Sequence, residues 1–189
     1  GIDTVVMQAE DIRIPGEHNI ENYMAAIASV WGRVPVAAIV QFARAFDGVE
    51  HRRELVRERN GVKWYNDSIG SSPSRTIAGL QTFRQKVILI AGGYDKHIPY
   101  TPLGPVAAEK VQAAVLLGAT ADAIEAAIRA CSDLPIYRVN DMAEAVHTAD
   151  RIAKAGDIVF MSPASASFDM YKNFEERGKH FKSLVLELP

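Results

Sequence analysis

The segment NDSIGSSPSRT, residues 66–76, combines one carboxylate, Asp67, with several small hydroxyl side chains, among them Ser71. It lies between an extended run and a helical pattern. Backbone N–H groups at the start of such a helix favour an anion. Ser72, in front of Pro73, would also serve as an ordinary helix cap, and the spacing suits either interpretation. Residues 66–76 are therefore a candidate anion-binding loop.

The segment AGGYDKHIP, residues 91–99, follows the most apolar run of the chain. Its two adjacent glycines let the backbone approach a ligand closely. Lys96 adds a flexible positive charge that suits a carboxylate or a phosphate. The segment matches neither the G-x-G-x-x-G pattern nor a Walker A phosphate loop. A surface lysine on a turn explains the same residues equally well.

The segment SPASASFDMYKNFEERG, residues 162–178, is rich in hydroxyl groups directly after another apolar run. Ser167 is followed by Phe168 and Phe174, two aromatic residues with acidic, basic and amide side chains between them. Hydroxyl donors where a buried strand ends indicate a pocket for a carboxylate or a phosphate. The alternative is that the two aromatic rings only anchor the final helix.

Near the amino terminus, the segment GEHNIENYMAA (residues 16–26) places Asn19 and Asn22 on one face of an expected helix. Asparagine is slightly disfavoured inside helices, so two on one face need an explanation. Capping explains Asn19 but explains Asn22 poorly. Side-chain amides can also read the donor and acceptor edge of a purine, as they do in nucleic-acid recognition. His18 beside them is a weak signal alone.

The sequence gives no support to several other functional classes. No spacing indicates a serine–histidine–aspartate triad, a metal-ligand cluster or paired glycosidase carboxylates. The Gly-Lys pair at residues 178–179 is followed by His180 and lacks the upstream glycine of a P-loop. The formal net charge of -2 gives no reason to expect nucleic acid or anionic lipid as a partner.

The composition is that of an ordinary globular protein, with 48% hydrophobic and 23% charged residues. No apolar run reaches the roughly 18 residues that a bilayer span needs, and no signal peptide is visible, so we expect a cytoplasmic protein without membrane partners. The single cysteine, Cys131, excludes an intrachain disulfide, and we interpret it as inert packing. The basic stretch at 51–63 interleaves Glu54 and Glu58 with arginines, which favours a solvated strand surface.

Hydrophobic periodicity and turn residues predict the elements that position these segments. Asn60-Gly61 separates two extended runs and is a strong hairpin signal. Ser72, Thr120 and Asp141 mark the starts of helices. Helices are expected at 18–31, 35–46, 72–83, 102–110, 121–130, 141–154 and 170–186. Strands are expected at 53–59, 62–66, 87–92, 113–118, 135–139 and 157–162.

Continuous apolar strands that alternate with amphipathic helices indicate an α/β fold, with a mostly parallel sheet covered by helices on both faces. The hairpin adds an antiparallel edge, so we predict a Rossmann-like α/β domain over residues 49–189. Residues 1–48 contain two expected helices and no strand, and we interpret them as a short helical segment that ends a preceding domain. In open α/β sheets ligands bind where strands end, which is where the three candidate loops begin.

Taken in order, these segments resemble the carboxy-terminal half of the Mur ligase family. The resemblance runs from about Gly16 to the end of the chain. It is carried by GEHNIENYMAA, by the pair His51-Arg52, by GVKWYNDS, by the Gly-Gly…Lys loop, and by SPASASFDMYKNFEERG, which is the most specific.

The family has three domains, of which the central one is a P-loop ATPase. The resemblance implies that residues 1–48 end this ATPase domain and that residues 49–189 form the C-terminal amino-acid-binding domain. The P-loop then lies outside this chain, in the missing amino-terminal and central domains that would be its partners.

The resemblance also implies roles for individual residues. For ATP it implies Asn19, Asn22, Arg52 and Asp67. For D-glutamate it implies Lys96, Ser71, Ser167, Phe168 and Phe174. It implies no catalytic residue and no metal ligand within this chain.

The implied reaction is the addition of D-glutamate to UDP-N-acetylmuramoyl-L-alanine in peptidoglycan synthesis. ATP, with Mg²⁺, phosphorylates the substrate carboxylate, and the D-glutamate amine attacks the acyl phosphate. The chain by itself is expected to be inactive. The alternatives are another Mur or folylpolyglutamate synthase-type ligase, or a non-catalytic α/β binding module. The Asp-Asn-Pro-Arg signature of relatives that add diaminopimelate is absent, which favours D-glutamate.

Two positions depart from the family pattern. Some members carry lysine where this chain has Ile69, and asparagine where it has Ser72. Isoleucine cannot contact a phosphate or a carboxylate. Another residue must therefore supply what that lysine does, and Arg75 is the candidate.

Overall fold

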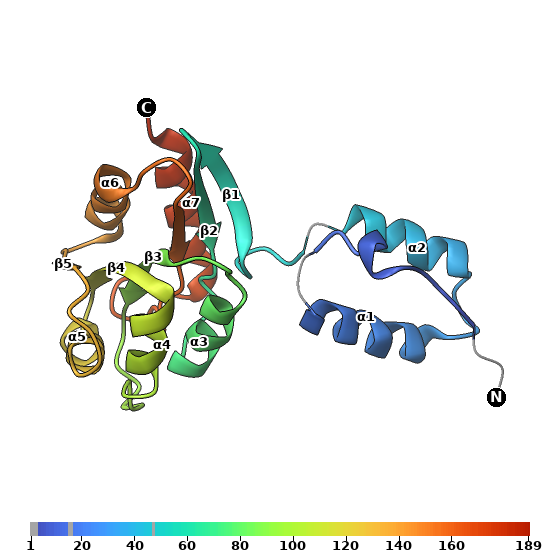
Figure 1. The fold of residues 1–189 in the computed structure, drawn as a ribbon, viewed down its shortest axis with the longest axis horizontal. Helices are drawn as coiled ribbons and strands as arrows, with labels where there is room; N and C mark the ends of the chain where they lie inside the picture. Colours follow the sequence, from blue (N-terminus) through green and yellow to red (C-terminus); the bar gives the residue numbers. More distant parts are fainter. Residues whose placement is uncertain (1–3, 15–16, 47) are drawn as a thin grey trace. The chain divides into compact units, whose positions relative to one another are not determined.

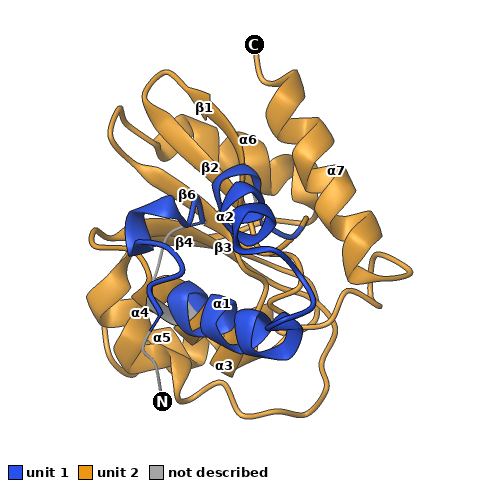
Figure 2. Ribbon diagram, turned by 90° about the vertical axis from the view of Figure 1, so that its right-hand side faces the viewer, with its two compact units in different colours: residues 1–49 blue, residues 50–189 orange. Residues whose placement is uncertain are grey.

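The computed structural model describes residues 4–14, 17–46 and 48–189, except the side chains of residues 17 and 18. The interpretation of His18 therefore lies outside the described side chains. The chain divides into two compact units, Gly1–Val49 and Glu50–Pro189, which Figure 2 shows in different colours. Within the described ranges, every helix is too short or too polar to cross a bilayer.

The first unit is helical in its described residues. A 3₁₀ turn, Ala9–Asp11, precedes α1 (Glu17–Val30) and α2 (Val36–Ala45), so both expected helices are present (Figure 1). The Arg44 guanidinium donates to the Asp11 carboxylate at 2.8 Å. This ion pair ties the end of α2 to the 3₁₀ turn.

The second unit is described throughout and is built on one six-stranded sheet. Its strands are β1 (Glu54–Arg59), β2 (Val62–Asn66), β3 (Val87–Gly92), β4 (Val111–Leu117), β5 (Ile136–Arg138) and β6 (Ile158–Met161). Its helices are α3 (Pro73–Gln81), α4 (Leu103–Lys110), α5 (Ala121–Arg129), α6 (Met142–Ile152) and α7 (Phe174–Glu187).

The strand order is β1-β2-β6-β3-β4-β5. β1 runs antiparallel to β2, and all other neighbouring strands are parallel. Figure 1 shows the helices packed on the two sides of this sheet. The predicted α/β fold, a mostly parallel sheet with an antiparallel hairpin edge, is therefore confirmed.

The predicted two-residue hairpin turn joins β1 to β2. Asn60 and Gly61 have φ angles of 51° and 77°, and both lie in the left-handed region that a type I′ turn requires. Arg59 and Val62 are paired directly across the turn. The turn residues thus set the register of the antiparallel edge.

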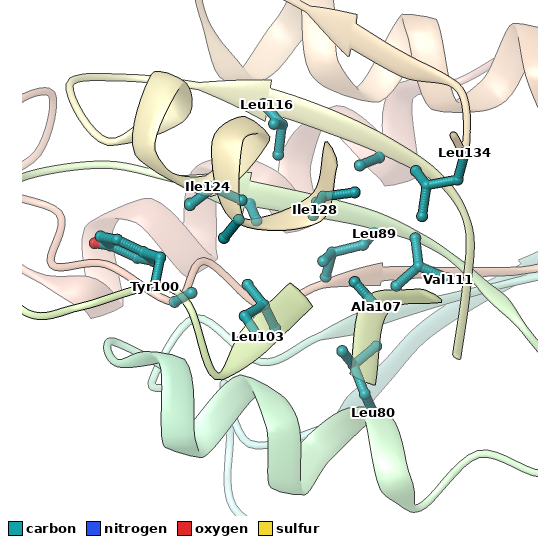
Figure 3. Packing of buried hydrophobic residues seen from close by; sticks show 14 of the residues in the cluster. Leu80, Leu89, Tyr100, Leu103, Ala107, Val111, Leu116, Ile124, Ile128 and Leu134 are labelled. Carbon is teal, nitrogen blue, oxygen red and sulfur yellow. The ribbon is translucent and has the colours of Figure 1, made fainter. Parts of the chain in front are cut away.

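β3 shows why the central strands form continuous apolar runs in the sequence. All six of its residues are buried. Val87, Leu89 and Ala91 belong to the hydrophobic cluster that α3, α4 and α5 complete, part of which Figure 3 shows around Leu89. Ile88 and Ile90 belong to a second cluster, with α6 and α7. Because helices cover both faces, no position of the strand is free to be polar.

The last helix begins later than its periodicity predicts. The expected range is 170–186, whereas α7 begins at Phe174. The Asn173 side-chain oxygen accepts a hydrogen bond from the backbone N–H of Glu176 at 2.8 Å, which satisfies one of the free donors at the helix start. The four residues before Phe174 therefore stay in the loop that follows β6.

β1 is less solvated than its interleaved charges suggest. The Arg57 guanidinium donates to three backbone carbonyls at the end of α7, at 3.0 to 3.1 Å. Arg59 donates to the Pro189 carbonyl at 2.7 Å and to Asp150 at 2.6 Å. Carbonyls in the last turn of a helix lack intrahelical partners, so these contacts stabilise the end of α7. The interpretation of a solvated strand surface is wrong for both arginines.

Candidate functional site

Three loops that carry predicted site residues lie next to one another at one end of the sheet. β6 is hydrogen-bonded to β2 on one side and to β3 on the other, all three in parallel. The loops after these strands, at residues 67–72, 93–102 and 162–173, therefore leave the sheet from its carboxyl end. That end is where ligands bind in open parallel sheets.

The loop that carries Lys96 lies directly against the loop that carries Ser167. Tyr94 and Ala166 form an isolated antiparallel bridge, in which the Tyr94 N–H donates to the Ala166 carbonyl at 2.9 Å. The Gly92 N–H also donates to the Pro163 carbonyl at 2.8 Å. Backbone hydrogen bonds thus hold the two loops together.

Two glycines, the last residue of β3 and the one after it, lie close to the backbone of neighbouring strand ends. Their φ angles of 123° and 145° are in the region that favours glycine. A Cβ atom on Gly92 would lie 1.8 Å from the Leu117 carbonyl oxygen, and one on Gly93 would lie 2.2 Å from the Ala166 oxygen. The glycines therefore make space for neighbouring backbone, whereas the sequence predicted that they make space for a ligand.

Arg177 joins the loop after β2 to the loop after β6. Its side chain is buried; Nε donates to the Ser68 hydroxyl at 3.0 Å and an Nη atom to the Ser68 carbonyl at 2.9 Å. The other Nη atom donates to the carbonyls of Ser165 and Ala166 at 3.1 and 3.0 Å. Burial lowers the pKa of Arg177 to about 10, so the guanidinium keeps its charge at neutral pH.

The sequence interpretation missed Arg177, because the run FEERG reads as a solvated charged helix face. The spacing of Arg177 from later apolar residues nevertheless indicates that its side chain is buried. Arg177 precedes Phe181 by four residues and Val185 by eight, and both of these side chains are fully buried. Residues four apart share a helix face, so the spacing places the arginine on the buried side of α7.

Asp67 is the buried carboxylate of the loop after β2. Oδ1 accepts a hydrogen bond from the Arg53 N–H at 3.1 Å, and Oδ2 accepts one from the Ser162 hydroxyl at 2.8 Å. Burial raises the pKa of Asp67 to about 6, although these hydrogen bonds oppose that shift. Glycine at position 70 leaves space for this carboxylate, because a Cβ atom there would lie 2.6 Å from Oδ2. Asp67 is thus a positioned acceptor that is mostly ionised at neutral pH.

The other predicted residues of this loop are less buried. Ser71 is half-buried, and Arg52, just before the paired Arg53, is exposed. Ser72 stands at the N-cap position of α3, but its hydroxyl lies 3.2 Å from the Ser74 hydroxyl and caps no backbone N–H. Ser72 therefore marks the start of α3 as predicted, but its side chain does not cap the helix. Ile69 is half-buried.

The residues predicted around Ser167 differ in their surroundings. Ser167 is only 3% exposed, and its backbone carbonyl accepts hydrogen bonds from the N–H groups of Met170 and Tyr171 at 3.1 and 2.8 Å. Phe168 is 65% exposed. Phe174 is half-buried and meets the His51 ring edge-on, with ring centroids 6.1 Å apart. The alternative that the aromatic rings only anchor the last helix fits Phe174 and does not fit Phe168.

Lys96 is exposed at the tip of its loop, and it forms no ion pair with any described residue. The ends of the loop are fixed. Tyr94 holds one end through its bridge, and the buried Tyr100 hydroxyl holds the other end, 2.8 Å from the Ser165 hydroxyl. Lys96 is therefore a free cation on a segment anchored at both ends to the β6 loop.

A cavity of about 650 Å³ lies beside this loop, between it and helices α4 and α5. It is lined by Asp95, His97, Ile98, Pro99, Tyr100, Thr101, Pro105, Ala123, Ala126, Ala127, Ala130 and Cys131. Neither Lys96 nor Ser167 lines it. Cys131 is exposed, so the interpretation of this cysteine as inert packing is wrong.

In the first unit the predicted amide pair is present on α1. The Asn22 side-chain nitrogen donates to the Asn19 side-chain oxygen at 3.4 Å, and Asn19 is 7% exposed while Asn22 faces solvent. Asn19 is the third residue of α1, so it lies inside the first turn and not in front of the helix. The two amides share one helix face as the spacing predicts.

Comparison with known proteins relates the chain to one family. The profile of the Mur ligase glutamate ligase domain matches residues 51–165. The chain is 58% identical to the UDP-N-acetylmuramoylalanine–D-glutamate ligase of Acetivibrio thermocellus, and the match covers 97% of this chain and 41% of that protein. It is 48% identical to the ligase of the same name from Clostridium perfringens, over 95% of this chain and 40% of that protein. The chain thus spans well under half of these relatives' length.

Solved structures share the fold at low sequence identity. The UDP-N-acetylmuramate–alanine ligase of Thermotoga maritima superposes with a TM-score of 0.67 at 15% identity, over 91% of this chain and 38% of that one. The folylpolyglutamate synthase of Mycobacterium tuberculosis superposes with a TM-score of 0.62 at 17% identity, over 90% of this chain and 41% of that one.

Proposed function

This chain belongs to the Mur ligase family, and from that premise we propose that it is the amino-acid-receiving part of a ligase that adds D-glutamate to UDP-N-acetylmuramoyl-L-alanine. Relatives that are 48–58% identical carry the name of this activity. The observation that carries the proposal is the backbone contact between the Lys96 loop and the Ser167 loop, which brings the segments that carry an exposed lysine and a serine hydroxyl to the same end of the sheet.

D-Glutamate carries two carboxylates, so a site that orients it needs donors for both. In the proposal Lys96 and the hydroxyls of Ser71 and Ser167 supply these donors. Phe168 and Phe174 border the methylene groups between the carboxylates. Charge-assisted hydrogen bonds to carboxylates are stronger than neutral ones, which suits a small anionic substrate.

The role of this unit in the reaction is positioning. The D-glutamate amine must attack an acyl phosphate made from ATP and the carboxylate of the UDP-linked substrate. A reactant held in the correct orientation gains a large rate advantage over one that arrives by diffusion. Arg177 contributes indirectly, because it fixes the loops of Ser68 and Ser165 to each other.

For ATP we propose Asp67 and Arg52 in the second unit and Asn19 and Asn22 in the first. The Asp67 carboxylate suits a ribose hydroxyl, because it is a fixed acceptor. Each of its oxygens accepts one hydrogen bond and keeps a further lone pair for such a hydroxyl. We assign Mg²⁺ no ligand in this chain. The phosphate loop is proposed to lie in the rest of the ligase.

The test compares Lys96→Ala with the unchanged full-length ligase. Loss of a charge-assisted contact is expected to raise KM for D-glutamate about tenfold to 100-fold, with KM for ATP unchanged. Lys63→Ala is the matched control, since Lys63 is an exposed lysine at the opposite end of β2. An unchanged KM for D-glutamate would refute the role of Lys96.

Acceptor choice separates the related functions. The full-length ligase is expected to release ADP with D-glutamate and not with L-glutamate or diaminopimelate. A preference for L-glutamate would favour a folylpolyglutamate synthase-type ligase instead. Failure of every amino acid to support ADP release would favour a binding module.

A further inference from the structure

Within the second unit, large apolar side chains are exposed mainly on two loops. The exposed ones in this unit are Leu55, Tyr94, Ile98, Phe168, Met170 and Leu186. Four of these six belong to the loops after β3 and β6, while Leu55 and Leu186 are isolated on β1 and α7. Scattered apolar residues are normal on a surface, but a cluster of them marks a contact site.

Two members of this cluster form an aromatic pair. The rings of Tyr94 and Phe168 meet edge to face, with centroids 6.0 Å apart and planes inclined by 72°. This is a favourable geometry for two aromatic rings. Both rings stay open to solvent, since Tyr94 is 45% and Phe168 is 65% exposed. The pair therefore keeps ring surface that solvent can reach.

The backbone around the pair is fixed. Tyr94 is bridged to Ala166, two residues before Phe168. On the far side of Phe168, the Asp169 carboxylate accepts a hydrogen bond from the Ala119 N–H at 3.3 Å. The two rings are thus held in place from three strand ends.

Two polar residues of the proposed site are close in sequence to the same pair. Lys96 follows Tyr94 by two residues, and Ser167 directly precedes Phe168. An apolar surface on the segments that also carry an ammonium group and a hydroxyl donor suits a short carbon chain with a carboxylate at each end. Such a surface also lowers the local dielectric constant, which strengthens the contact of Lys96 with a carboxylate.

We propose that Tyr94 is a specificity-determining residue of this site, which with Phe168 forms an apolar wall against the two side-chain methylene groups of the amino-acid substrate. The inference rests on the proposed function and deepens it. The wall selects for the length of the carbon chain, whereas Lys96 and Ser167 select for its carboxylates.

The experiment measures kcat and KM of the full-length ligase for D-glutamate and for D-aspartate, which is one methylene group shorter. Tyr94→Ala is expected to raise KM for D-glutamate about two- to tenfold, the range expected for loss of an aromatic contact. It is also expected to lower the ratio of kcat/KM for D-glutamate to kcat/KM for D-aspartate. Tyr94→Phe keeps the ring and is expected to change KM less than about twofold.

Three further variants complete the test. Phe168→Ala and the double variant Tyr94→Ala/Phe168→Ala are expected to be non-additive, because each single change already breaks the wall. Leu186→Ala removes an exposed apolar side chain at the far end of α7 and is expected to change nothing. Unchanged melting temperatures identify the effects as local.

Two results would overturn the inference. One is a Tyr94→Ala enzyme with unaltered KM for D-glutamate and unaltered discrimination. The other is a rise in KM for the UDP-linked substrate instead, which would assign the pair to a contact with another domain. Lys96→Ala separates this outcome from failure of the proposed function: if that variant raises KM for D-glutamate and Tyr94→Ala does not, only the wall is refuted.

Discussion

Replacing Asp67 by asparagine removes a buried charge while it keeps the shape of the side chain. The side-chain oxygen remains an acceptor for the Arg53 N–H. The new amide group faces the Ser162 hydroxyl, which can turn to accept, since it also lies 2.8 Å from the Thr76 hydroxyl. The substitution therefore tests the charge with little change in packing.

The magnitude follows from the pKa of Asp67, which burial raises from 3.8 to about 6. A carboxyl group whose pKa is higher in the folded state binds protons more tightly when folded. It therefore destabilises the fold progressively as the pH rises from about 4 to about 6, and by a constant amount above that. About two pKa units correspond to about 3 kcal/mol at pH 8. Asp67→Asn is expected to raise the unfolding free energy by up to about 3 kcal/mol at pH 8 and to leave it almost unchanged at pH 4.

The assay is urea unfolding of the chain at several pH values from 4 to 8. Trp64 is fully buried in the second unit, so its fluorescence reports the unfolding of this unit. Asp133→Asn, at an exposed carboxylate, is the control and is expected to have no pH-dependent effect. A difference in unfolding free energy between Asp67→Asn and the unchanged protein that stays the same from pH 4 to pH 8 would refute the reasoning.

Three further predictions concern the contacts that build the site. Arg177→Ala leaves the buried carbonyls of Ser68 and Ser165 without this donor and is expected to lower the unfolding free energy by about 3 kcal/mol, seen as a lower urea midpoint. Gly93→Ala places a methyl group against the Ala166 carbonyl and is expected to lower the unfolding free energy more than Gly156→Ala does. Gly156 also has a positive φ, but no atom lies within 4 Å of a Cβ added there. Equal urea midpoints for the two variants would contradict this. Asn173→Ala removes the cap of α7 and is expected to lower the unfolding free energy by about 1 kcal/mol, again measured by urea unfolding.

The elements of this fold were largely predictable because their signals are local. The buried run at 87–92 coincides with β3, and the Asn60-Gly61 turn adopts the predicted conformation. Asp141 caps α6 as its spacing predicts, accepting a hydrogen bond from the Glu144 N–H at 2.8 Å. The start of α7 was missed because the apolar periodicity continues through residues that the Asn173 cap excludes from the helix.

The site was less predictable because its contacts join distant parts of the chain. The three loops meet only because β6 lies between β2 and β3, and no local pattern gives that strand order. Ser72 and Thr120 resemble helix caps in sequence, but their hydroxyls bond to other side chains, Thr120 to that of Ser165. Arg177 resembles a surface charge, yet it is buried among carbonyls.

The most direct test of the account is a double-variant cycle on KM for D-glutamate in the full-length ligase, with Lys96→Ala, Ser167→Ala and the two combined. If both loops hold one dicarboxylate, each single variant raises this KM about tenfold or more while KM for ATP stays constant, and the combined variant binds D-glutamate more weakly than either. A Ser167→Ala enzyme with the KM of the unchanged protein would contradict the claim that the two loops share the substrate.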